Sequence, residues 1–184
     1  MVNITKEQID IALPKIKAGH ATYKSIHECL SKIDVSNDLE FQKKFNGFYR
    51  IGRRPKDWYK SYYDLFEESK KKGSADFGEI LDELHARTGK IEASFVSKLV
   101  HTIHQDKPIL DQYVLRNLRL SQIADMKKNK LKIIQLYDDV AEKIEEIIQS
   151  DDGKYLVEHF TLMYPDTNIT KTKMVDFVLW QIRE

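Results

Sequence analysis

The chain has 184 residues, 41% of them hydrophobic and 32% charged, with a formal net charge of +1. This composition excludes a fibre or a disordered tail, and the balanced charge lacks the large basic excess that a dedicated nucleic-acid binder usually carries. No apolar run is long enough to cross a bilayer, no secretory leader is visible, and the single cysteine excludes an internal disulfide. We therefore expect one cytoplasmic domain over residues 1–184 with no membrane partner.

Helical periodicity and helix-end signals follow one another along the first half of the chain. Pro14 interrupts the first helical segment, which predicts a kink or two short helices. Pro55 suits the first turn of a helix, and the lysines before Gly73 are typical of a helix C-terminus. The expected helices lie at about 5–17, 22–33, from 39 past Phe48, from 55 to about 72, and 75–88.

The stretch from Gly89 to Leu118 predicts a helix, a tight turn and a second helix. Its first helix carries apolar residues at helical spacing: Ile91, Phe95, Leu99 and Ile103. Pro108 ends that helix because proline lacks an N–H and disfavours helical backbone in the preceding residue. A new helix then opens with Asp111 as its N-cap.

The remaining sequence predicts further helices from 126 or 131 to 149, at 154–163 and at 170–183. We expect the Asp151-Asp152-Gly153 segment to break the chain between the first two of these. No convincing alternating strand pattern and no internal repeat is found. The predicted fold class is all-α, as a single compact multi-helix domain.

Two ionisable residues near the turn are candidates for catalysis. Asp111, held by backbone N–H groups at a helix start, would stay ionised and could activate water or stabilise a cation. Lys98 could be a buried amine of lowered pKa that acts as a nucleophile. The simpler alternatives are that Asp111 is only a helix cap, and that Lys98 snorkels to the surface or pairs with Asp111 or Glu92.

His101 and His104, one turn apart, could share a metal ion, but the sequence offers no obvious third ligand. We expect them at surface and edge positions. No phosphate-binding glycine loop, paired-cysteine spacing or hydrolase motif is present. The sequence therefore predicts no metal and no cofactor.

Basic residues gather in two windows of the chain, at 43–60 and at 127–132. Arginines interleaved with aromatic residues can hold phosphates and stack on bases, although such aromatics more often belong to the core. The second window, at the start of the helix before 149, places cations where the helix dipole disfavours them. The candidate DNA-contacting residues are Lys43, Arg50, Arg53, Arg54, Lys127 and Lys128.

Five short patterns resemble the helix-hairpin-helix DNA glycosylase superfamily, in particular its short 8-oxoguanine-glycosylase-like bacterial members. They are Gly89 before an apolar helix, the Pro108-Ile109-Leu110-Asp111 turn with Ser97-Lys98-Leu99 before it, and the Phe48-Tyr49-Arg50 and Asp176–Trp180 segments. The resemblance implies a glycosylase-like helical fold with a degenerate hairpin that retains one glycine. It also implies that Lys90 lies at the DNA.

The resemblance further implies DNA binding with removal of a flipped base, in which Asp111 stabilises the sugar cation or orients water. The alternative function is a non-catalytic helical interaction protein of a bacterial defence or mobile-element system, which kept the fold without the chemistry.

Overall fold

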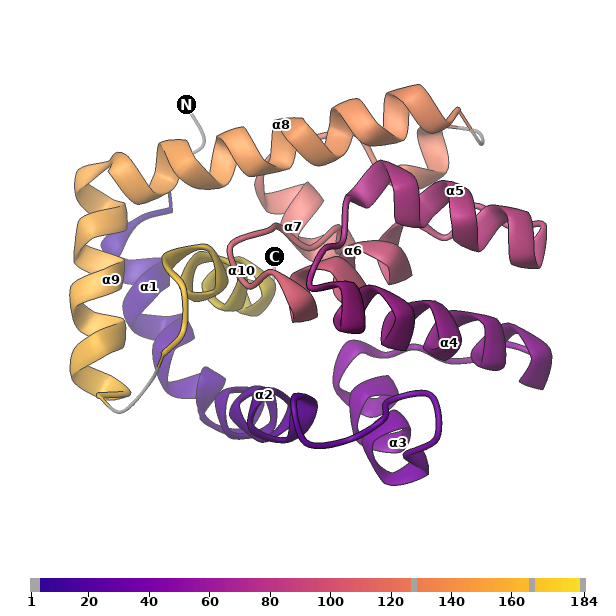
Figure 1. Cartoon of the computed structure of the whole chain (residues 1–184). Helices are drawn as coiled ribbons and strands as arrows, with labels where there is room; N and C mark the ends of the chain where they lie inside the picture. Colours follow the sequence, from indigo (N-terminus) through magenta and orange to yellow (C-terminus); the bar gives the residue numbers. More distant parts are fainter. Residues whose placement is uncertain (1–3, 127–128, 166–167, 183–184) are drawn as a thin grey trace. The chain divides into compact units, whose positions relative to one another are not determined.

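The computed structural model describes residues 4–126, 129–165 and 168–182, and these residues form helices and no strand. The predicted all-α fold class is therefore confirmed. The chain divides into two units, the first made of residues 1–17 and 105–184 and the second of residues 18–104. Figure 1 shows the helices of both. The single domain over residues 1–184 stays a prediction.

Unit 2 is built from five consecutive helices around an aromatic core. The rings of Phe45 and Phe66 lie 5.4 Å apart between centroids, and those of Trp58 and Tyr62 stack at 5.1 Å. The aromatic residues of the basic window at 43–60 are therefore mostly core. The helices are α2 (Lys17–Leu30, all but its first residue), α3 (Leu39–Tyr49), α4 (Lys56–Lys72), α5 (Phe77–Thr88) and α6 (Ala93–Ile103).

Local capping sets several helix ends of unit 2. The Asp38 and Asp76 side chains accept hydrogen bonds from the first turns of α3 and α5. Gly73 and Gly89 end α4 and α5 in the left-handed conformation, with φ of 64° and 68°. Pro55 precedes α4 as its N-cap residue, one position earlier than its predicted place in the first turn.

In unit 1, helices from both of its chain segments pack around α10. Seven consecutive α10 residues, Lys173–Leu179, are buried, and α10 contacts α1, η1, α7, α8 and α9. The predicted interruption at Pro14 is confirmed, because a 3-10 turn follows α1 there. The elements are α1 (Lys6–Ala12), η1 (Leu13–Ile16), α7 (Gln112–Asn117), η2 (Ile123–Met126), α8 (Lys130–Gln149), α9 (Asp151–Met163) and α10 (Lys171–Gln181).

The predicted break between these two helices is present, but it lies at Ser150 and not at Asp151-Asp152-Gly153. Ser150 ends α8 and also caps α9, because its hydroxyl accepts from the backbone N–H of Gly153 at 3.0 Å. Gly153 lies inside α9, and a Cβ there would stand 1.7 Å from the carbonyl oxygen of Ile147. The glycine therefore permits the sharp corner between the two helices and does not end either of them.

Replacing Gly153 with Ala should lower the free energy of unfolding by about 1–3 kcal/mol, because the added methyl meets a backbone carbonyl that cannot yield easily. Gly47→Ala is the matched control, since a Cβ at that helical position meets nothing within 4 Å. It should stabilise the chain by up to about 1 kcal/mol through helix propensity. Urea unfolding followed by circular dichroism measures both, and equal effects of the two substitutions would contradict the account.

Candidate functional site

The Asp111 side chain caps α7 in unit 1, as predicted. Its Oδ1 accepts a hydrogen bond from the backbone N–H of Tyr113 at 2.9 Å, and its own backbone is extended. Pro108, Ile109 and Leu110 just before it are buried and anchor the turn. The carboxylate itself is half-buried. It is thus held at a fixed point at the start of α7 and retains access to solvent.

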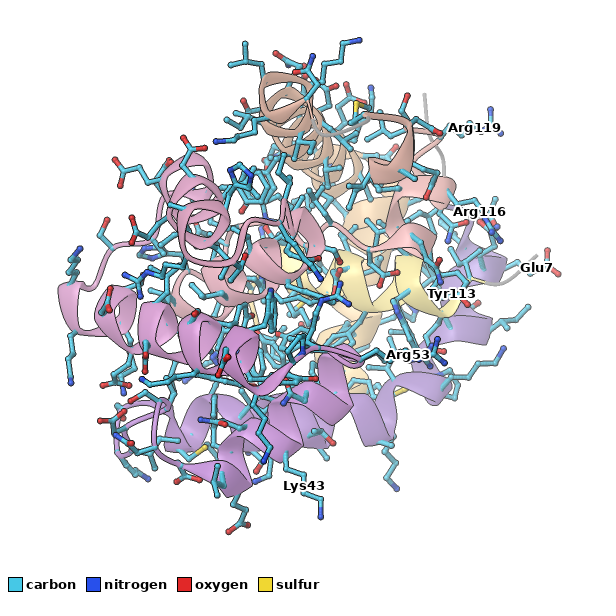
Figure 2. All side chains as sticks on the ribbon, turned by 90° about the vertical axis from the view of Figure 1, so that its right-hand side faces the viewer. Glu7, Lys43, Arg53, Tyr113, Arg116 and Arg119 are labelled. Atoms are coloured by element: carbon cyan, nitrogen blue, oxygen red, sulfur yellow. The ribbon has the colours of Figure 1, made fainter. Side chains whose placement is uncertain are left out.

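An aromatic and cationic surface, which we call the α7 surface, is formed by Tyr113, Arg116 and Arg119 of the same segment and by Trp180 of α10. The Tyr113 ring lies edge-on to Trp180 at 6.0 Å, and the Arg116 guanidinium stands 5.9 Å from the Tyr113 centroid. Arg116 and Arg119 are exposed and form no ion pair with any residue that the structure describes. Figure 2 shows Tyr113, Arg116 and Arg119 at the same edge of unit 1.

Hydrogen bonds to α10 fix the position of this short helix. The side-chain amide of Asn117 donates to the carbonyl oxygen of Leu179 at 2.7 Å and to that of Ile182 at 3.2 Å. Arg119 follows in the left-handed conformation, with φ of 55°. Sequence reasoning missed Arg116 and Arg119. Arg116 follows Tyr113 by three residues and Arg119 follows Arg116 by three, and this spacing was the available signal.

Lys98 lies in unit 2, whereas Asp111 lies in unit 1. The lysine is buried with 6% of its surface exposed, its Nζ donates to the Ser94 hydroxyl at 3.1 Å, and it stands 5.2 Å from the centre of the Phe95 ring. The ammonium therefore has a polar partner and an aromatic partner on its own helix.

Arg54 is committed to a contact within unit 2. Its Nε lies 2.9 Å from Oε1 of Glu92, its Nη2 lies 3.0 Å from Oε2, and its guanidinium stands over the Phe95 ring at 4.9 Å. Such a two-point pair fixes the plane of the guanidinium and uses the donors that a phosphate would need. Glu92, a predicted alternative partner of Lys98, is engaged by Arg54.

The other predicted DNA-contacting residues of unit 2 are exposed. Lys43 lies on α3, Arg50 and Arg53 flank the turn before α4, and Lys90 follows α5. Both arginines have a positive φ, 53° and 59°. Lys127 and Lys128 lie outside the described residues. Two surface depressions, of about 500 Å³ between α2 and α3 and about 430 Å³ between α1 and α9, do not include Asp111 among their lining residues.

The predicted surface position of His101 is wrong. His101 is fully buried, and its Nε2 lies 3.0 Å from the hydroxyl of Tyr23. The reason is that α6 is buried over most of its circumference, so one-turn spacing does not bring both histidines to the surface. His104 is half-buried and accepts from the backbone N–H of Ala75. Within the described part of the chain, no group of three potential ligands could hold a metal ion.

A buried ion pair in α10 was not predicted. Lys173 and Asp176, one turn apart, form a salt bridge with side-chain exposures of 3% and 8%, and the lysine Nζ also lies 4.4 Å from the Phe177 ring centre. The lysine-x-x-aspartate spacing was the available signal. Because both groups are covered, the pair belongs to the packing of unit 1.

Removing the carboxylate with Asp176→Ala should cost about 3–5 kcal/mol of stability, because it leaves a buried ammonium without its counter-charge. The double variant Lys173→Met/Asp176→Leu should recover most of that loss, since it removes both charges and keeps the volume filled. Thermal unfolding of the unmodified chain, the single variant and the double variant measures these differences in stability. A double variant as unstable as the single one would show that the pair does more than balance charge.

No protein-family model matches this chain, and no curated protein and no solved structure matches it either. No helix among the described residues is long and apolar enough to cross a bilayer.

Proposed function

We propose that this protein binds DNA through the α7 surface and removes a base by N-glycosylase chemistry in which Asp111 acts on the sugar. One observation carries the proposal: the half-buried Asp111 carboxylate and the exposed Arg116 and Arg119 belong to one short segment of unit 1. A fixed carboxylate and exposed cations on one segment suit a substrate that is itself polyanionic and develops positive charge when it reacts.

The α7 surface has the groups that a nucleic-acid strand requires. Arginines hold phosphates with several N–H donors at once, and this contribution falls as salt rises. Tyr113 and Trp180 offer aromatic faces and edges against which a base can pack. Exposed basic residues of unit 2, namely Lys43, Arg50, Arg53 and Lys90, are proposed to hold backbone phosphates as well. Arg54 is left out because Glu92 engages it.

The proposed chemistry needs one carboxylate and one water molecule. The bond between C1′ of the sugar and the base nitrogen breaks, the base leaves with the electron pair, and C1′ acquires positive charge. Asp111 stabilises that charge, orients the water that forms the new C1′–O bond, and accepts its proton. Lys98 takes no part, because it is buried and bonded to Ser94.

The Arg116→Ala/Arg119→Ala variant should bind a duplex carrying 8-oxoguanine about tenfold more weakly at low salt and reduce the salt slope of log K by about 2. The control is Arg87→Ala/Lys143→Ala, which removes the same charge from side chains already paired with Glu68 and Glu146. It should bind like the unmodified chain. Fluorescence anisotropy across a salt series measures both, and equal losses would exclude the α7 surface as the contact.

Asp111→Asn should abolish base release and leave DNA binding intact, because asparagine also caps helices and keeps α7 in place. Base release is measured in single turnover at protein excess on duplexes carrying oxidised bases. Binding without release by the unmodified chain would remove the catalytic part of the proposal, and no salt-sensitive binding would remove all of it.

One observation favours the second candidate, a non-catalytic interaction protein. The bond between Asp111 and the Tyr113 N–H is that of an ordinary helix cap, so stabilising α7 is a sufficient reason for this carboxylate. In that case Asp111→Asn would change neither stability nor any binding activity.

A further inference from the structure

Large hydrophobic side chains are exposed at two separate places in unit 1. Among the described residues, Ile11, Leu162 and Met163 are 54%, 71% and 46% exposed and belong to α1 and α9. Leu131, at the start of α8, is 80% exposed. The remaining exposed residue of this kind, Leu39, is 76% exposed and lies in unit 2. Exposed apolar groups that gather beside a depression are typical of a docking surface.

The first place is a groove, which we call the α1–α9 groove, with a volume of about 430 Å³. Its lining residues are Asp10, Leu13, His159, Leu162 and Met163. Leu13 is only 1% exposed and forms an apolar floor, whereas Leu162 and Met163 form an apolar wall. The size and apolar lining suit one aliphatic side chain with its neighbours.

The groove carries negative charge on both of its helices. The Asp10 carboxylate accepts a hydrogen bond from the Tyr155 hydroxyl at 3.0 Å, which raises the pKa of Tyr155, and Asp10 forms no ion pair with any described residue. Glu7 precedes Asp10 by one turn and is exposed, as Figure 2 shows. Glu158 precedes Leu162 by one turn and is also exposed. Lys6 stands over the Tyr155 ring nearby.

The second place is complementary to the first. Leu131 lies in the first turn of α8, which Asn129 caps, between Lys130 and Lys132. Lys132 is exposed. Cations in the first turn of a helix are disfavoured by the helix dipole, so a nearby carboxylate would stabilise them. Leu131 and its lysine flank thus present one apolar knob with positive charge beside it.

We propose that Leu131 of one copy of this chain inserts into the α1–α9 groove of a second copy, with Lys132 facing the Asp10 carboxylate. The opposite charges of knob and groove select a second copy as the occupant. Figure 1 shows α8 running to the corner with α9, and Leu131 lies in the first turn of α8, at its other end. The 20 residues of α8 span about 30 Å, so the knob does not reach its own groove. The contact therefore joins two different copies, and it does not depend on the proposed DNA chemistry.

Sedimentation velocity of the full chain tests the proposal. Because one leucine knob buries little area, association should be weak, with a Kd on the order of 0.1–1 mM, and the weight-average sedimentation coefficient should rise with concentration. Leu131→Glu and Leu162→Glu should each abolish this rise. Leu39→Glu, which changes an equally exposed leucine of unit 2, should leave it unchanged.

The decisive measurement mixes the two variants that are expected not to associate alone, Leu131→Glu and Leu162→Glu. Leu131→Glu keeps a working groove and Leu162→Glu keeps a working knob, so their mixture should form a 1:1 dimer that cannot grow further. Lys132→Glu should weaken association, and Asp10→Lys added to it should restore association by reversing both charges. A wild-type chain that stays monomeric up to about 1 mM would overturn the proposal. So would variants that still associate alone, or a mixture that stays monomeric.

Discussion

Two helices are buried over most of their circumference, and their polar side chains must therefore find partners inside the protein. In α6 the Lys98 ammonium bonds to Ser94 and the His101 ring bonds to Tyr23. In α10 the charges of Lys173 and Asp176 neutralise each other. An unpartnered charge in these positions would cost several kcal/mol, so these residues are fixed by packing. The groups left for a ligand lie on the elements that surround these helices, and α7 is one of them.

The helix limits were largely predictable because caps and breakers act over a few residues. Asp38, Gly73, Gly89 and Asp111 mark helix ends through their own side chains or backbone conformation, and the structure agrees with each. Gly153 was misassigned because its role depends on the corner between α8 and α9, which no local signal reveals. The same limit applies to His101, whose burial follows from the packing of the whole of α6.

The candidate site was predictable only in part. Asp111 was found because a proline turn and a following helix leave a capping carboxylate at a known position. Arg54 could not be excluded from a DNA surface by its sequence, because Glu92 is 38 residues away. Arg116 and Arg119 were overlooked because their spacing from Tyr113 does not say which face of this short segment stays open. That face is settled by the bonds of Asn117 to α10, more than 60 residues later.

The chain enters unit 1, leaves it for the whole of unit 2, and then returns. Contacts inside unit 1 accordingly join residues far apart, such as Asp10 with Tyr155 over 145 positions and Leu13 with Tyr164 over 151. Closing such long loops carries an entropic cost. Unit 2 avoids this cost because it is one continuous segment. During synthesis, unit 2 can complete its fold as soon as α6 has left the ribosome. The apolar side of α1 stays uncovered until α9 and α10 are made.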